Sequence, residues 1–375
     1  MSAAIVFSAV VAIYVLVGLL GRKLPAGENS GFSRTFALTL PIVTVASAAT
    51  LAIGFNIWSA VIAAISVLVA VVAAGLVSRG GWVRFETRSP AASFAGWLCS
   101  VVVVVGFGLV LVDFAVGVAA DLTGLAYWAL AIPVIVGGVA AGWGGGGGRG
   151  RAKFMLVVVA VIAVLALVGG IFLGSPANLG TRMIPAGDPG WLENIAFPVA
   201  LVIAALAHPG LGLGRGSKTR PTIITAITSA LVLLATMAGL LMLLGGVIVA
   251  PSVQLNALVA FLPPAINIGL GAIAVALAVT VLAQSTDLIL NGLSELDSLW
   301  PSSAGGQVCR RASLAAVLGL VWLVLALWSP SPVTVVGALA VVSIVGLFLR
   351  LRASRAAPSP AAGDAPRESE RTNVG

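Results

Sequence analysis

The sequence predicts an all-α polytopic membrane protein with about eleven transmembrane helices. Of its 375 residues, 60% are hydrophobic and only 9% are charged, and the mean hydropathy is +1.15. Soluble globular domains carry about 25% charged residues, so this composition excludes that class. We therefore expect a multi-pass protein of the plasma membrane, the inner membrane in a two-membrane cell.

Eleven apolar runs approach the roughly 20 residues that a helix needs to cross a hydrocarbon core of about 30 Å. The first run lacks a preceding basic residue, which favours a retained span over a cleaved signal peptide. The "GGGGGRGRAK" stretch is expected to be a flexible link, and residues 353–375 a disordered tail. The runs are residues 3–21, 35–55, 57–78, 93–117, 125–143, 154–174, 194–213, 222–249, 265–293, 312–328 and 333–350.

The basic residues predict the orientation, because lysine and arginine gather in cytoplasmic connections. Of the 20 basic residues, 19 fall after odd-numbered runs, and only Arg182 falls on the other side. This pattern places the N-terminus outside and the C-terminus in the cytoplasm. The residues that agree are Arg22, Lys23, Arg34, Arg79, Arg84, Arg88, Arg149, Arg151, Lys153, Arg215, Lys218, Arg220, Arg310, Arg311, Arg350, Arg352, Arg355, Arg367 and Arg371.

Several function classes are disfavoured by residue counts. Two cysteines and one histidine, His208, do not suffice for a disulfide framework or a zinc or haem cluster. The net charge of +8 is scattered between apolar runs, so no nucleic-acid partner is expected. Paired carboxylates at metal spacing and a nucleophile beside a base are both missing from the pattern. We expect no enzyme, no cofactor, and no metal other than a sodium ion.

The number of spans suggests an internal repeat. If residues 3–21 form an extra helix, ten spans remain, and five spans per half force the second half to insert upside down. The predicted transporter domain, residues 1–352, then contains a first repeat at 35–174 and a second at 194–350. This inverted 5+5 arrangement is the plan of many secondary transporters.

A polar stretch interrupts one of the most apolar runs, "LAQSTDLILNG" at residues 282–292. Gln284, Asp287 and Asn291 follow the spacing of one helix face, and Ser285 and Thr286 flank it. One interpretation is a site where hydroxyls and backbone carbonyls coordinate a small cation. The other is that the hydroxyls bond to carbonyls one turn earlier in the same helix, and the sequence leaves both open.

Asp113 lies well inside the run 93–117. An ionised carboxyl there needs a partner, a water cavity or a proton. It is a candidate proton or cation site, and the alternative is a neutral acid that ties this helix to a neighbour.

Two other runs contain helix-breaking residues. In "LAHPGLGLGRGSKTRP" at 206–221, proline and glycines including Gly210 predict an interrupted helix whose freed backbone groups bind substrate, or a glycine-rich helix end. His208 in the same stretch is a better candidate for a structural imidazole than for a proton sensor. In the run 35–55, Ser47 and Thr50 lie among small residues, either as a packing seam or as half of a cation site facing run 265–293.

These features together resemble the solute:sodium symporter family, especially its acetate and monocarboxylate permease branch. The resemblance extends from the first span to the "LFLRLR" ending of the last. It rests on a collection of motifs in the family's order, although His-Pro stands where the family commonly has Pro-His and a glycine expected in the run 35–55 is missing. The motifs are "SAAT" at 47–50, "GWGGGGGRGRAKF", "AHPGLGLGRGSKTR" and "QSTDLILNGLSELDSL".

The resemblance implies a leucine-transporter-like fold and a sodium site. It implies hydroxyl ligands from Ser285 and Thr286, with carbonyl ligands near Val43, Ala46 and Leu282. An alternative alignment that fixes Asp297 instead moves the hydroxyl pair onto Val281 and Leu282, which lack hydroxyls. Substrate would lie between the interrupted runs 35–55 and 194–213.

The leading hypothesis is a secondary active transporter that imports a small organic solute, such as a monocarboxylate or an amino acid, with sodium or protons. The alternative is a transporter-derived sensor or partner protein without transport activity. The expected partners are the solute and the lipid bilayer. The sequence leaves open a small membrane subunit or a homo-oligomer.

Overall fold

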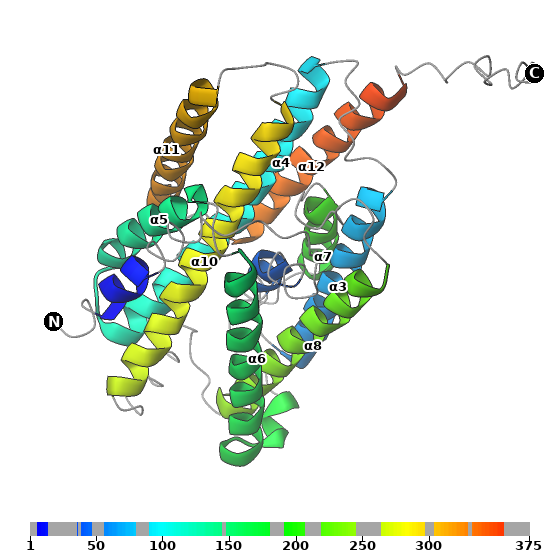
Figure 1. Ribbon diagram of the computed structural model, residues 1–375. Helices are drawn as coiled ribbons and strands as arrows, with labels where there is room; N and C mark the ends of the chain where they lie inside the picture. The colour runs from blue at the N-terminus through cyan, green and yellow to red at the C-terminus, as the bar shows by residue number, and fades with distance from the viewer. Residues whose placement is uncertain are drawn as a thin grey trace, which may run out of the picture.

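The described part of the chain folds into helices and connecting turns without any strand (Figure 1). A computed structural model describes residues 6–13, 36, 39–46, 56–79, 90–144, 148–180, 191–206, 219–244, 264–296, 304–328 and 332–355. Two short helical segments, residues 6–13 and 39–46, precede the long helices. We call residues 39–46 the central segment.

Nine long α-helices and one 3-10 helix follow within the described ranges. Seven of the α-helices are long and apolar enough to cross a membrane, and α5 and α7 are shorter apolar helices. The elements are α3 (Ile57–Arg79), α4 (Pro90–Thr123), α5 (Tyr127–Trp143), α6 (Gly148–Leu173), η2 (Pro176–Gly180), α7 (Trp191–Leu206), α8 (Thr219–Leu244), α10 (Pro264–Leu296), α11 (Ala304–Trp328) and α12 (Pro332–Arg355).

Local sequence explains several helix ends. The helices α4, α10 and α12 each begin at a proline, whose missing N–H is not needed in the first turn. The Asn56 carboxamide oxygen accepts a hydrogen bond from the Ser59 amide at 2.8 Å, which caps α3. Gly124 follows α4 with a φ of 67°, a left-handed conformation that glycine adopts without strain.

All the predicted spans coincide with helix in the described ranges, and the prediction of an all-helical membrane fold is confirmed. The prediction of a flexible link at residues 144–153 was wrong for its second half, because α6 already begins at Gly148. Helix propagation from the apolar run that follows outweighs the cost of two glycines, about 1 kcal/mol each. The helix α12 continues to Arg355, so the first three residues of the predicted tail are helical. Residues 356–375 lie outside the described residues.

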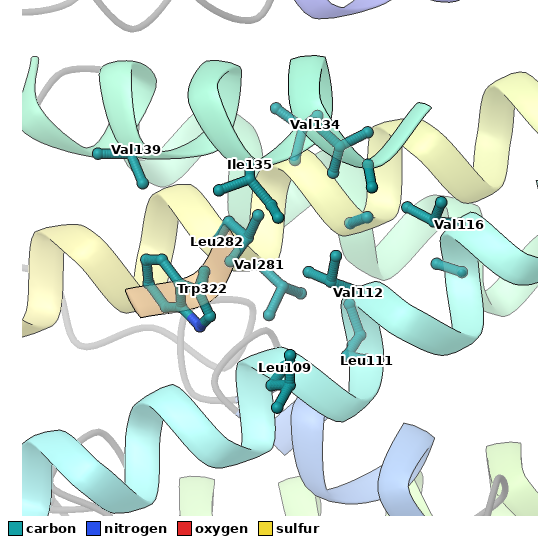
Figure 2. Close-up of a cluster of buried hydrophobic side chains, with 14 of the residues drawn as sticks. Leu109, Leu111, Val112, Val116, Val134, Ile135, Val139, Val281, Leu282 and Trp322 are labelled. Carbon is teal, nitrogen blue, oxygen red and sulfur yellow. The ribbon is translucent and has the colours of Figure 1, made fainter. Parts of the chain in front are cut away.

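The buried apolar side chains form two clusters. The first, the α4/α10 cluster, joins α4, α5, α10 and α11 with Phe7, Phe36, Leu40 and Met155. Figure 2 shows part of it, with Val134 and Ile135 of α5 facing Leu282 of α10. The second, the α3/α8 cluster, joins the central segment, α3, α7, α8 and α12. One face of α4, with Val103, Phe107 and Val110, also belongs to it.

The central segment lies between these clusters, in the middle of the helices (Figure 1). Leu40 belongs to the α4/α10 cluster, whereas Ile42, Val45 and Ala46 belong to the α3/α8 cluster. All residues of the segment are buried except the half-buried Thr44. The segment is therefore surrounded by protein, which in a membrane is where irregular backbone and ion ligands can be tolerated.

Candidate cation and substrate site

The predicted hydroxyl-bearing stretch lies on α10, on the side that meets α5. Two glycines of α5 make this contact close, because an added Cβ at Gly138 would lie 2.5 Å from Cβ of Leu282. An added Cβ at Gly142 would likewise lie 2.5 Å from Cβ of Thr286. Small residues four positions apart allow two membrane helices to approach in this way. Leu282 and Thr286 are both fully buried at this crossing.

Ser285 points toward α4 and α11. An added Cβ at Gly108 of α4 would lie 3.7 Å from the Ser285 hydroxyl and 3.6 Å from the indole of Trp322. The indole N–H of Trp322 donates to the Val105 carbonyl at 3.2 Å, which satisfies its one donor in the α4/α10 cluster. Ser285 is therefore buried at the junction of α4, α10 and α11.

The Thr286 hydroxyl oxygen is buried and has no hydrogen-bond partner in the structure. Threonine in a membrane helix commonly donates to the carbonyl one turn earlier, as Thr280 does to Ala276 at 2.6 Å. Thr280, which precedes the polar stretch, follows this local pattern, and Thr286 within the stretch does not. An unpaired buried hydroxyl is costly, so Thr286 is available to a ligand such as a cation or water.

A second set of polar residues occupies the far side of α10. Successive helical residues are rotated by about 100°, so Thr280, Gln284 and Asp287 all lie away from the α5-facing position of Leu282. Thr280 is fully buried, and the other two are half-buried. Asn291 continues this row within α10, and its side chain lies outside the described residues.

The predicted carbonyl ligands of the central segment are in the other cluster. Val43 and Ala46 are buried within the α3/α8 cluster, whereas Leu282 is buried within the α4/α10 cluster. The structure thus groups Leu282, Ser285 and Thr286 on one side of α10, and Val43 and Ala46 on a second helix. Val43 and Ala46 therefore lie in a different cluster from Leu282.

Asp113 has a specific partner on the next helix. The Tyr127 hydroxyl, at the start of α5, donates to a carboxyl oxygen of Asp113 at 2.7 Å. Both residues are half-buried, and Tyr127 also packs edge-on against Trp128. This bond connects α4 to α5, as the structural interpretation of Asp113 requires. A proton or cation role for Asp113 stays a prediction.

Four predicted site residues lie outside the described residues. They are Ser47, Thr50, His208 and Gly210. The described part of α7 ends at Leu206, and Ser343 of α12 donates to its Ala204 carbonyl at 3.0 Å. This fully buried hydroxyl therefore bonds to the last turn before the predicted break.

The sequence interpretation missed three contributors to this region: Tyr127, and the glycines Gly138 and Gly142. Tyr127 is one of only two tyrosines and follows the acid by 14 positions at the start of the next span. The glycines stand four residues apart within an apolar run, a spacing typical of close helix contacts. Each signal was visible in the sequence, but neither identifies the partner helix.

The fold is similar to that of a known transporter. No protein-family model and no curated protein matches the sequence. A solved structure of a Na⁺-coupled sialic acid symporter, in a substrate-bound outward-open state, matches with a TM-score of 0.61. The match covers 93% of this chain and 87% of that one at 13% sequence identity. At this identity the match establishes a shared fold.

Proposed function

We propose that the protein is a sodium-coupled secondary transporter that imports a small organic solute, and that it belongs to the solute:sodium symporter family. The observation that carries this proposal is the shared fold over nearly the whole chain with a Na⁺-coupled symporter. The buried central segment and the polar residues of α10 support it, because polar groups inside a membrane protein commonly mark substrate and ion pathways.

Helix pairing supports the inverted repeat of residues 35–174 and 194–350. In that scheme α3 is equivalent to α8, α4 to α10, and α5 to α11. Each of these three pairs is in direct contact. Two halves related by an axis in the membrane plane place equivalent helices beside one another at the axis, so these contacts are expected of such a repeat.

The two clusters suggest how the protein would alternate between its open states. Each cluster is packed as a unit, and packed interiors resist continuous deformation. We propose that one cluster moves against the other, with the central segment and α4, which belong to both clusters, at their boundary. We propose that sodium binds at this boundary, with carbonyls near Val43 and Ala46 and with the Leu282, Ser285 and Thr286 set of α10. Because ion and solute would share this boundary, each would raise the affinity for the other by the same factor.

The solute class follows from the small number of charged groups. Asp113 and Asp287 are the ionisable residues of the described apolar spans that our proposal places near the pathway. A small monocarboxylate or an amino acid requires less charge compensation than a polyanion. We propose Asp113, Gln284, Asp287 and Asn291 as coupling or substrate residues, together with Ser47, Thr50, His208 and Gly210.

Uptake into proteoliposomes tests the proposal. Labelled acetate, pyruvate, proline and sialic acid are supplied with an inward sodium gradient, and in parallel with potassium in its place. We expect one of these solute classes to accumulate only with the sodium gradient. Accumulation that follows a proton gradient instead would assign the coupling to protons. Silence of the whole panel under both gradients would contradict transport of these classes.

The placement of Ser285 and Thr286 favours one competing function. Their contacts with α4 and α5 suit a transporter-derived sensor that binds a ligand without moving it. Thermal stabilisation by a solute without counterflow of that solute indicates the sensor. Counterflow indicates the carrier.

A further inference from the structure

A buried hydrogen bond links the central segment to α8. The hydroxyl oxygens of Thr39 and Ser229 lie 2.9 Å apart, and both residues are fully buried. They are separated by 190 positions in the sequence, so the bond is a tertiary contact between the proposed repeats. It was not among the sequence predictions.

The direction of this bond follows from the donor count. Thr39 also bonds to the Phe36 carbonyl at 2.7 Å, and a carbonyl can only accept. Threonine has one O–H to donate, and that proton is used for Phe36. Ser229 is therefore the donor to Thr39. The result is two hydrogen bonds in series, from Ser229 of α8 to Thr39 and from Thr39 to the Phe36 carbonyl. They connect α8 to the first turn of the central segment.

The two hydrogen bonds of Thr39 give the segment a directional constraint in addition to its apolar packing. Ile42, Val45 and Ala46 pack by apolar contact, and apolar contact is not directional, so it permits small rotations and shifts along the helix axis. A hydrogen bond weakens steeply with misalignment. Val43 lies one turn after Thr39, so a rotation at Thr39 moves the Val43 carbonyl by a similar angle.

We propose that Ser229 is a positioning residue of the cation site: through Thr39 it fixes the rotation of the central segment and so aims the carbonyls near Val43 and Ala46. This inference rests on the proposed sodium coupling and adds a residue of α8 that does not touch the ion. Loss of the bond lowers sodium affinity because the carbonyls must then be ordered by the ion itself.

The test measures equilibrium binding of ²²Na⁺ to the purified full chain, so it requires no knowledge of the solute. Ser229→Ala removes the donor. Ser66→Ala is the matched control. Ser66 is also buried, on α3 of the α3/α8 cluster, and its hydroxyl donates to the Ile62 carbonyl of its own helix at 2.6 Å. Melting temperatures of both variants without sodium report any general loss of stability.

We expect Ser229→Ala to bind ²²Na⁺ about two- to tenfold more weakly than wild type, the range that corresponds to one net hydrogen bond. Ser66→Ala should bind like wild type even where its melting temperature falls. Thr39→Ser, which keeps the hydroxyl, should retain wild-type affinity, and Thr39→Val should lose as much affinity as Ser229→Ala. Adding Ser229→Ala to Thr39→Val should cause no further loss, because both act through one bond.

Three results distinguish a failure of the proposed sodium coupling from a failure of the positioning role of Ser229. Wild-type protein that binds no ²²Na⁺ overturns sodium coupling, and this inference with it. Wild-type binding together with unchanged affinity in Ser229→Ala overturns the positioning role alone. Should Ser229→Ala not fold, equal affinities of Thr39→Ser and Thr39→Val would overturn it in the same way.

Discussion

The close crossing of α5 and α10 makes a sharp prediction for Gly142→Ala. The added Cβ would lie 2.5 Å from both the Ala283 carbonyl oxygen and Cβ of Thr286. Neither atom is the end of a flexible side chain, so the two helices must separate, by about 1 Å if ordinary contact is to be restored. Such overpacking typically costs about 1–3 kcal/mol. Alanine regains up to about 1 kcal/mol of helix propensity, so a cost at the middle or upper end of this range leaves a net destabilisation of about 1–2 kcal/mol.

Thermal unfolding in detergent, followed by tryptophan fluorescence, measures this effect. The matched control is Gly108→Ala on α4, where the nearest atoms to the added Cβ are 3.6 Å away. This variant gains the same propensity without a clash, so its melting temperature should equal or exceed that of wild type. Gly142→Ala should melt at a lower temperature than both wild type and Gly108→Ala. Equal melting of the two variants would refute the close approach of α5 and α10.

Four further substitutions test individual polar groups. Thr286→Val should leave the sodium-free melting temperature unchanged or higher, because it removes an unpaired hydroxyl, and should reduce the stabilisation by sodium chloride relative to potassium chloride. An unchanged sodium response would mean that Thr286 does not bind the ion and that any ligands from α10 lie on its opposite face. Tyr127→Phe should destabilise by about 1–3 kcal/mol, because it leaves the half-buried Asp113 without this donor. Asp113→Asn keeps an acceptor and should melt near wild type, so any loss of uptake in it reports a coupling role. Ser343→Ala should destabilise by about 0.5–1.5 kcal/mol through loss of the bond to Ala204, and no change in melting would mean that the bond is not stabilising.

Apolar length was sufficient to predict the long helices of the described ranges. A bilayer requires every spanning segment to satisfy its own backbone, so a long apolar run has few alternatives to helix. The errors occurred where this constraint is absent. The glycines at the start of α6 and the arginines at the end of α12 lie beyond the apolar runs, where hydropathy does not show whether the helix continues.

The arrangement of the candidate site could be predicted only in part. A period of 3.6 residues separates Gln284 and Asp287 from Leu282 on α10, because α10 is one continuous helix. The sequence does not show which neighbour each face meets. That choice depends on Gly138 and Gly142, which let α5 approach on the side of Leu282 and Thr286. The contact with α5 is a property of two helices together, so no pattern within α10 contains it.

The position of the central segment explains why its rotation should matter more than that of a long helix that lies inside one cluster. It has apolar contacts in both clusters, through Leu40 in one and Ile42 in the other. A helix inside one cluster moves with its neighbours, so a small shift changes few contacts. The central segment contacts both clusters. When it moves together with one cluster, its contacts with the other cluster change. An ion that holds this segment in one rotation therefore selects one arrangement of the two clusters, by as much as its affinity differs between them. If sodium raised the melting temperature without changing the accessibility of cysteines placed between the clusters, this account of coupling would be wrong.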